Sequence, residues 1–293
     1  MNAFLHVLEG GLQTTIQDGG RTGFLALGVP RGGALDDLSF RLANRLAGNP
    51  PGTAVLELRS PGPVLRVDAA SARIVLTGSG QGLVIERGGE ARHWASWRAI
   101  DVGRGDILRI VPFADTAVAY LAVAGGFDVP EVLGSRSTDT LSNTGPSPVR
   151  AGDSLLVGAM SGPLPDEEQF PPPPPMDDPV EIRVRPGPRD DWFTPGSLRA
   201  LFHETWTVTS ELDRVGIRFH GPGRLHRARH EEMPSEGMVP GSLQIPPDGH
   251  PVLFLVDHPV TGGYPVAAVA VAADLPVAAQ LRPGQRVRFV PVR

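Results

Sequence analysis

Turn-forming residues divide this 293-residue chain into short segments and so limit what it can fold into. The sequence holds 36 glycines and 31 prolines, residues that favour turns and interrupt helices and central strands. Short apolar runs between such turns are typical of β-barrels and β-sandwiches, not of a parallel α/β sheet. We therefore predict a mostly β fold with a few short helices. The predicted strands span residues 54–58, 64–67, 73–77, 83–86, 107–112 and 117–123 in the first half, and 181–185, 206–209, 215–219, 251–257 and 286–290 in the second.

Two segments depart from this pattern and predict helices. Leucines recur every four residues from 38 to 46, after a possible cap at Asp36 or Asp37 and before a stop signal at Gly48. A second, shorter helix is expected to begin at Thr194-Pro195, because proline is favoured in a first helical turn.

The length of the chain suits two domains, and a shift in composition marks the boundary between them. Hydrophobic residues make up 41% and charged residues 20% of the sequence, as in ordinary globular proteins, so the chain as a whole is expected to fold. Acidic residues are followed by five prolines at 171–175, which predict a stiff spacer; a docking site for a partner is the alternative. We predict an N-terminal domain at 1–165, a linker at 166–179 and a C-terminal domain at 180–293.

Missing residue types exclude several kinds of chemistry. The sequence has no cysteine, which excludes disulfides and thiolate nucleophiles and suits a reducing compartment. All 27 Lys+Arg residues are arginine, so a Schiff base, a P-loop lysine and a biotin-acceptor lysine are also excluded. The formal charge of -5 argues against nucleic-acid and anionic-membrane partners. Neither a secretory signal nor a membrane span is evident, so we expect a cytoplasmic protein.

Three local patterns favour a structural explanation. Gly78–Gly82 is like a phosphate-binding loop, but a strand follows it where a helix is needed, so we predict a hairpin turn. His226 and His230 have the spacing of zinc ligands, but the flanking arginines would repel a cation, so we predict a charged loop and no metal site. No G-x-S-x-G sequence occurs, which leaves only a serine triad assembled from distant residues.

Polar residues set among glycines carry more functional information, because glycine lets backbone amides approach a ligand or a developing oxyanion. The motifs of the first half are Q-T-T-I-Q-D-G-G-R at 13–21, G-V-P-R-G-G-A-L-D at 28–36, L-A-V-A-G-G at 121–126 and G-S-R-S-T at 134–138. Those of the second half are E-L-D-R-V-G-I-R at 211–218, S-E-G-M-V-P-G-S-L-Q-I-P-P-D-G at 235–249 and T-G-G-Y-P at 261–265. Together the motifs resemble the carboxyltransferase A–B domain family, whose members are also described as the second subunit of allophanate hydrolase.

This resemblance implies a fold and an activity. The fold would be two cyclophilin-like β-barrel domains. The activity would be that of the 5-oxoprolinase C subunit, one component of an ATP-dependent hydrolase that opens the lactam of 5-oxoproline to give glutamate. ATP with magnesium would act at the level of the complex. The partners would be a kinase-inhibitor-like subunit (the B type) and a lactam-hydrolase-like subunit (the A type), and the activity of the isolated chain stays open.

Two other functions are open on the same resemblance. One is a biotin-dependent carboxyltransferase subunit that acts on urea or another small amide, with biotin carried by a partner chain. The other is a non-catalytic regulator that binds a kinase-inhibitor-like partner. Family members often carry Ser, Thr and Lys at the positions of Gly32, Val260 and Val266, so this copy is also compatible with an altered substrate or a regulatory role.

Polar residues within the matching motifs form the candidate site. Both reactions handle a small amide whose carbonyl gains negative charge, which calls for a cation, a base and aimed donors. We expect catalytic roles for Arg136 as an anion clamp and for Glu236 and Asp257 as general-base or metal-side carboxylates. Asp213 and Arg214 would form either a charge pair that orients a loop or a structural bridge. The substrate-binding candidates are Ser137, Thr138, Asp213, Arg214, Gln244, Gly262, Gly263 and Tyr264.

Overall fold

The computed structural model describes residues 3–160 and 162–292, which divide into two compact units. The first unit contains the chain up to Arg21 together with residues 32–139 and 143–174, and the second contains residues 175–293 with the short segments 22–31 and 140–142. Both units are built mainly from strands, as predicted. Within the described ranges, no helix is long and apolar enough to cross a membrane.

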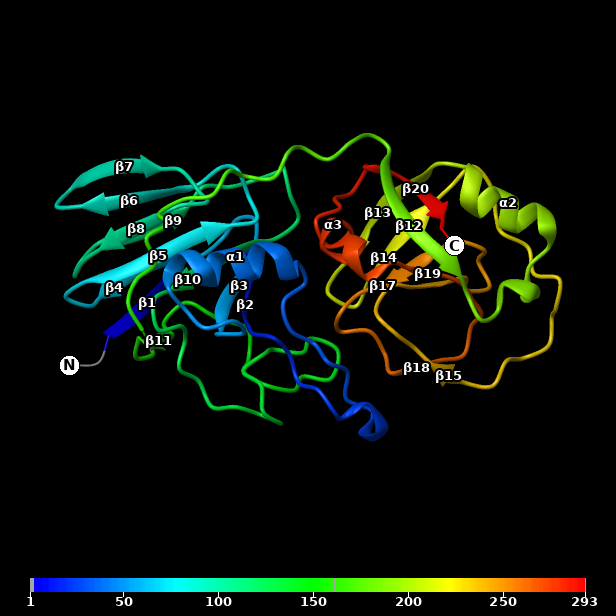
Figure 1. The fold of residues 1–293 in the computed structure, drawn as a ribbon, viewed down its shortest axis with the longest axis horizontal. Helices are drawn as coiled ribbons and strands as arrows, with labels where there is room; N and C mark the ends of the chain where they lie inside the picture. Colours follow the sequence, from blue (N-terminus) through cyan, green and yellow to red (C-terminus); the bar gives the residue numbers. More distant parts are fainter. Residues whose placement is uncertain (1–2, 161, 293) are drawn as a thin grey trace. The chain divides into compact units, whose positions relative to one another are not determined.

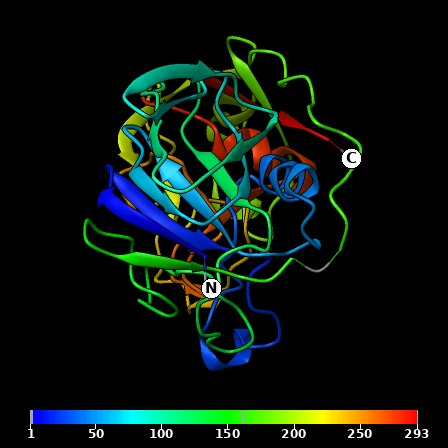
Figure 2. The same cartoon turned by 90° about the vertical axis from the view of Figure 1, so that its left-hand side faces the viewer.

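The N-terminal unit consists of two antiparallel sheets (Figure 2). The first has six strands in the order β11–β1–β4–β9–β6–β7, and the second has five in the order β2–β3–β10–β5–β8. The strands are β1 (Ala3–Glu9), β2 (Gln13–Gln17), β3 (Val55–Arg59), β4 (Val64–Asp68), β5 (Ala72–Thr77), β6 (Leu83–Arg87), β7 (Glu90–Trp94), β8 (Ala99–Val102), β9 (Ile107–Ile110), β10 (Ala119–Val123) and β11 (Ser154–Val157).

One apolar core lies between these two sheets, and a helix covers the outer face of the second. Leu5 and Leu108 from the first sheet and Leu56 and Leu121 from the second are fully buried in the same cluster. Every residue of β10 is buried, because α1 (Asp37–Ala47) packs on β5 and β10 from the other side (Figure 1). A strand covered on both faces is apolar at successive positions rather than at alternating ones, as in A-Y-L-A-V of β10.

A buried hydrogen-bond network fixes the start of α1. Asp36 caps the helix, accepting from the Ser39 amide at 3.1 Å, and Gly48 ends it in the left-handed conformation, as predicted. The Asp36 amide donates to the hydroxyl of Tyr120, which in turn donates to Glu57 at 2.8 Å. Burial raises the pKa of Tyr120 well above its usual range, with the charges of Glu57 and Asp36 adding to the effect. The hydroxyl therefore stays protonated and serves as a permanent donor.

Asp106 gives the N-terminal unit an acid-sensitive contact. Its carboxylate, 3% exposed, accepts from Arg87 Nε at 2.9 Å and from the Gly103 amide at 2.8 Å. The hydrogen bond from Arg87 lowers the pKa of Asp106 below its usual 3.8. A carboxyl group whose pKa is lower in the folded protein contributes stability above its unfolded pKa and loses it as the pH falls through the folded value.

We expect Asp106→Asn to lower the free energy of unfolding by about 1.5–3 kcal/mol at pH 7, as for hydrogen bonds to charged groups. The difference between the variant and the parent should shrink below about pH 4, where the parent's carboxyl group becomes protonated. Urea unfolding at pH 7, 5 and 3 checks both parts. A difference that stays constant across this range would contradict the assignment.

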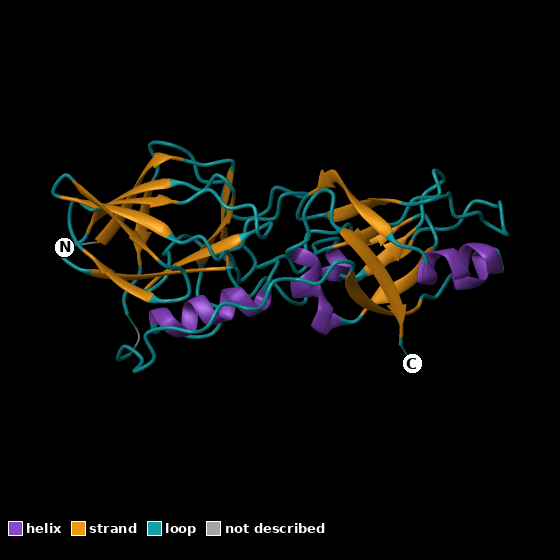
Figure 3. Ribbon diagram, turned by 90° about the horizontal axis from the view of Figure 1, so that it is seen from above, coloured by secondary structure: helices purple, strands orange, loops and turns teal. Residues whose placement is uncertain are grey.

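The C-terminal unit is a closed seven-stranded barrel with the order β12–β19–β16–β17–β14–β13–β20, closed by parallel pairing of β12 with β20 (Figure 3). Its strands are β12 (Val180–Pro186), β13 (Trp206–Leu212), β14 (Gly216–His220), β16 (Ser242–Gln244), β17 (Val252–Phe254), β19 (Val266–Ala270) and β20 (Arg286–Pro291). A separate two-stranded ribbon joins β15 (Glu236–Gly237) to β18 (Thr261–Gly262). The helices are α2 (Pro195–His203), capped by Thr194 as predicted, and α3 (Leu275–Ala279).

Alternation of buried and exposed residues follows from closing the barrel. Ile182 and Val184 of β12, Phe219 of β14 and Phe289 of β20 point inward, and the residues between them are exposed. The rings of Phe219 and Phe289 meet edge to face at 5.3 Å between centroids, a preferred aromatic geometry.

The strands predicted from sequence are present, most with small differences at their ends, but β17 covers only Val252–Phe254 of the predicted 251–257, and one turn prediction is wrong. Gly78–Gly82 links β5 to β6, but these strands lie in different sheets, so the segment crosses between sheets and is not a hairpin turn. The strand β6 follows it, as predicted. The structure also has strands that are not in the predicted list: β1, β2, β7, β8, β11, β15, β16, β18 and β19. Of these, β15, β16 and β18 have only two or three residues, which carry no readable periodicity.

Candidate functional site

Two motifs more than a hundred residues apart meet around Asp18 in the N-terminal unit. Asp18 follows β2, and its carboxylate accepts from the hydroxyls of Ser135 at 2.7 Å and Ser137 at 2.5 Å. It also accepts from the backbone amides of Arg136 at 2.6 Å and Gly20 at 2.8 Å. Asp18 thus holds the G-S-R-S-T loop against the end of β2 and has four donors of its own.

The guanidinium of Arg136, the predicted anion clamp, is directed to carboxylates of the same loop. It donates to Glu131 at 2.6 Å and to the Val129 carbonyl at 2.8 Å, and Asp128 lies at 3.6 Å. The side chain is 34% exposed. Two nearby carboxylates already balance its charge, so these contacts favour a loop-ordering role, and the role as an anion clamp stays a prediction.

Ser137 and Thr138 use their polar groups in contacts with other segments of the N-terminal unit. The Thr138 hydroxyl donates to the Pro146 carbonyl at 2.9 Å, and the Ser137 carbonyl accepts from Nη2 of Arg21. Arg21 is only 1% exposed and was missed in the sequence. Arg21 is the last residue of the Q-T-T-I-Q-D-G-G-R motif at 13–21, but nothing in that motif marks this arginine as a site residue.

Asp257 and Arg214 form a buried ion pair in the C-terminal unit. Arg214 donates from Nε to Oδ2 and from Nη2 to Oδ1 of Asp257, each at 2.9 Å. The side chain of Arg214 is 3% exposed, and that of Asp257 is 0% exposed. Thr140 adds donations from its amide and hydroxyl, both at 2.9 Å. Asp213 instead accepts from the Val215 and Gly216 amides in the turn before β14. Arg214 therefore pairs with Asp257, not with its neighbour Asp213.

His258 directly follows this pair and was also missed in the sequence. Its ring is 1% exposed, and Nδ1 lies 2.8 Å from the Pro259 carbonyl oxygen. Because a carbonyl only accepts, Nδ1 must carry the hydrogen, which leaves Nε2 of the neutral ring with its lone pair. Among the described residues Nε2 has no hydrogen-bond partner. A ring held in one tautomer with Nε2 unprotonated has the form of a general base.

Glu236, the other predicted general base, is paired with an arginine. It lies on β15, and Arg189 donates to it from Nε at 3.0 Å and from Nη2. The hydrogen bond from Arg189 lowers the pKa of Glu236 below its usual value. A carboxylate with a lower pKa accepts protons less readily, so this pairing favours an orienting role over proton abstraction.

Gln244, Gly262 and Tyr264 come together beside the β15–β18 ribbon. The Gln244 side-chain amide is buried and donates to the Tyr264 carbonyl at 2.9 Å. A methyl group on Gly262 would lie 2.7 Å from Gln244 Nε2 and 3.0 Å from the sulfur of Met238, so these two side chains would have to shift to admit any larger residue here. The Tyr264 ring is 44% exposed, with the Arg227 guanidinium 5.7 Å from its centroid. Gly263 has open space on the side that a Cβ would occupy, apart from Ser235 Oγ at 3.9 Å.

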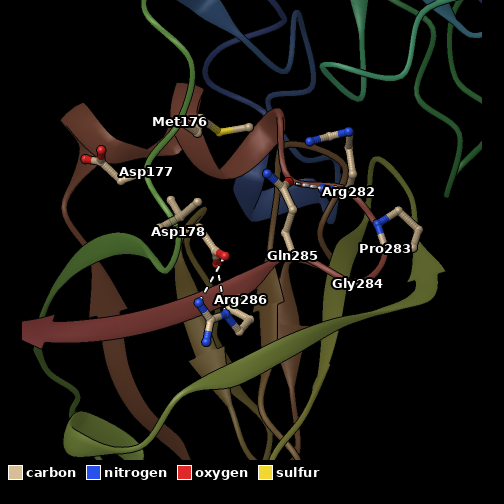
Figure 4. A pocket seen from close by; sticks show the side chains of 9 residues that line it. Met176, Asp177, Asp178, Arg282, Pro283, Gly284, Gln285 and Arg286 are labelled. Carbon is tan, nitrogen blue, oxygen red and sulfur yellow. Dashed lines mark hydrogen bonds and ion pairs between the residues drawn. The ribbon is translucent and has the colours of Figure 1, made fainter.

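A surface pocket of the C-terminal unit lies elsewhere. It is lined by residues 176–178 and 282–286 together with Val180, and Asp178 and Arg286 form a two-bond ion pair in it at 3.0 Å (Figure 4). Arg286 lowers the pKa of Asp178 below its usual value. None of the residues predicted for the site lines this pocket.

The predicted site residues thus fall into separate clusters. Arg136, Ser137 and Thr138 gather around Asp18 in the N-terminal unit. In the C-terminal unit Asp257 joins Arg214, and Gln244 and Gly262 meet beside the ribbon that carries Glu236. Across the described ranges, no group of three His, Asp or Glu side chains is placed to hold a metal ion.

The family model of the carboxyltransferase domain, subdomain A and B, matches residues 27–291. The chain belongs to this family. It is 33% identical to the 5-oxoprolinase C subunit of Escherichia coli over 98% of this chain and 90% of that protein. It is also 34% identical to the urea amidolyase of Lachancea kluyveri over 98% of this chain, but spans only 17% of that longer protein.

Solved structures agree with this family fold. The urea amidolyase of K. lactis superposes with a TM-score of 0.88 at 32% identity, covering 99% of this chain and 19% of that one. The protein TTHA0988 superposes with a TM-score of 0.85 at 36% identity, and the chain covers 55% of its length. The chain therefore spans only part of these two solved proteins.

Proposed function

We propose that this chain is a subunit of an ATP-dependent 5-oxoprolinase. The observation that carries the proposal is the extent of the match to the E. coli 5-oxoprolinase C subunit, which accounts for 90% of that protein. A second protein of the same name, from Haemophilus influenzae, is 33% identical and is also covered over 90% of its length. By contrast, the matches to urea amidolyases cover only a small fraction of the length of those proteins.

The second candidate is a biotin-dependent carboxyltransferase that acts on urea or another small amide. The TM-score of 0.88 against K. lactis urea amidolyase favours it. The absence of lysine from these 293 residues requires that biotin be attached to another chain. This candidate predicts transfer of a carboxyl group to an amide nitrogen, without release of glutamate.

The residues of the C-terminal unit suggest how a lactam would be handled. Gln244 and the backbone of Gly262-Gly263 would hold the amide, and the buried Arg214–Asp257 pair would keep the segment after β17 in place. His258 would be the group that accepts a proton, because its tautomer leaves Nε2 unprotonated. Glu236 would orient Arg189.

This chain lacks two features that often hold a nucleotide. It has no lysine for the phosphates, and across the described residues no group of three His, Asp or Glu side chains is placed to hold a metal ion. We therefore propose that ATP and magnesium bind to partner chains, one of the kinase-inhibitor-like B type and one of the lactam-hydrolase-like A type. A cytoplasmic location stays a prediction.

Reconstitution tests the proposal. We expect 5-oxoproline-dependent release of ADP and glutamate from the three subunits together, and loss of that activity when this chain is omitted. His258→Gln should reduce turnover by about 10²–10⁴-fold, the range for loss of a general base, whereas His203→Gln, at the end of α2, should leave it unchanged.

No turnover in a correctly assembled set would reject the 5-oxoprolinase assignment. Transfer of labelled carboxyl from carboxybiotin to urea would then support the second candidate. Binding to the kinase-inhibitor-like partner without either reaction would support a regulatory role.

A further inference from the structure

Arg21 is a buried cation without a counter-ion. It is 1% exposed, and among the described residues no carboxylate oxygen lies within ion-pairing distance of its guanidinium. Its neighbours are neutral carbonyls: Nη2 donates to Ser137, and Nε reaches Val132 only at 3.5 Å. Nη1 is buried, and no described atom lies within hydrogen-bonding reach of it.

This state is costly, and the arginine cannot relieve it by losing its charge. Arginine stays protonated in proteins, and a buried cation without a partner is unfavourable unless an anion is supplied. Arg214, which is also almost fully buried, shows the usual solution, a two-bond pair with Asp257. The carboxylate closest to Arg21 in sequence, Asp18, is instead occupied by Ser135, Ser137 and two backbone amides.

We infer that Arg21 is the anion-binding residue of this chain, and that its ligand is a small carboxylate. A guanidinium with a free Nη1 is suited to a planar carboxylate or a similar oxyanion. If the proposed function holds, 5-oxoproline, which carries a carboxylate, is the first ligand to test. Because Nη1 is buried, the ligand reaches it only when the surrounding turn moves aside. This inference moves the anion clamp from Arg136, whose charge is already balanced, to Arg21.

The test combines binding and stability in the full chain. Calorimetric titration with 5-oxoproline should show binding, and 2-pyrrolidinone, the same lactam without the carboxylate, should bind at least about tenfold more weakly. Arg21→Met should lose binding of 5-oxoproline but unfold at the same or a higher denaturant concentration than the parent without ligand, because it removes an unpaired buried charge. Arg66→Met, on the exposed side of β4, is the matched control and should bind normally.

Several outcomes would overturn the inference. They are normal binding by Arg21→Met, loss of binding in Arg136→Met but not in Arg21→Met, or marked destabilisation of the ligand-free Arg21→Met protein. Arg21→Lys keeps the positive charge but not the planar guanidinium, and it replaces the methionine variant in the test if that variant fails to fold. It should bind 5-oxoproline more weakly than the parent.

Titration with other anions distinguishes an anion site at Arg21 from the proposed 5-oxoprolinase function. Binding of bicarbonate or inorganic phosphate that depends on Arg21, with no binding of 5-oxoproline, would confirm an anion site and reject 5-oxoproline as its ligand. If no tested anion binds to the parent protein, the inference is wrong, whatever the reconstituted enzyme does.

Discussion

Asp257→Asn will lower the free energy of unfolding by about 3–5 kcal/mol, the cost of breaking a buried ion pair by removing one of its charges. The carboxylate is 0% exposed and receives two hydrogen bonds from Arg214 and two from Thr140. Asparagine has nearly the same shape, so the change removes charge without creating a cavity. Urea unfolding followed by circular dichroism measures the difference.

Asp178→Asn is the matched control for this prediction. Asp178 forms the same two-bond pair with Arg286, at 3.0 Å for each bond, but its side chain is 66% exposed. Water and salt screen an exposed pair, so we expect almost no change in stability. Equal effects of the two substitutions would show that the Arg214–Asp257 pair is not held away from solvent.

Gly145→Ala will strongly destabilise the segments packed around Arg21, by about 3 kcal/mol or more, as expected when a new Cβ overlaps neighbouring backbone atoms. Gly145 has φ +92°, a conformation that alanine rarely adopts, and a methyl group there would overlap the Ser137 carbonyl oxygen. It would also lie 3.0 Å from Arg21 Nη2. We expect lower thermal stability and, if Arg21 binds the anion, weaker binding of 5-oxoproline.

Gly134→Ala separates the clash from the backbone strain. Gly134 begins the G-S-R-S-T loop, whose Ser137 accepts from Arg21, with φ +73°, but a methyl group there would meet nothing within 4 Å. We expect it to cost only about 1–2 kcal/mol, the penalty of a left-handed backbone for a residue with a Cβ. If both substitutions cost the same, the contact between Gly145 and Ser137 is not important for stability.

Local sequence patterns predicted the secondary structure well where the pattern depends on neighbouring residues. Asp36 and Gly48 bound α1 because capping involves only the helix's own backbone. The alternation in β12 and β20 is readable because each strand has one face in the barrel. The Gly78–Gly82 prediction failed because sequence does not say which sheet the next strand joins.

Partners of charged side chains were not predictable in the same way. Asp213 and Arg214 are adjacent in the chain, yet Arg214 pairs with Asp257, 43 residues away. The exposed carboxylates near Arg136 and the lack of any described one near Arg21 are likewise properties of the folded loop. Since the roles of ionisable residues depend on such partners, the candidate site residues stay predictions, and Arg21 and His258 emerged only from the structure.

The sequence by itself determined a mostly β chain with two helices whose first residues could be predicted, and it excluded lysine and cysteine chemistry. Its glycine-rich polar motifs indicated the carboxyltransferase family. These features depend on residue type and on spacing within a few positions. The tertiary structure alone decided which arginine is neutralised, which carboxylate is buried and which histidine nitrogen faces a carbonyl. The physical reason is that burial and hydrogen bonding depend on contacts between residues far apart in the chain, which local spacing does not encode.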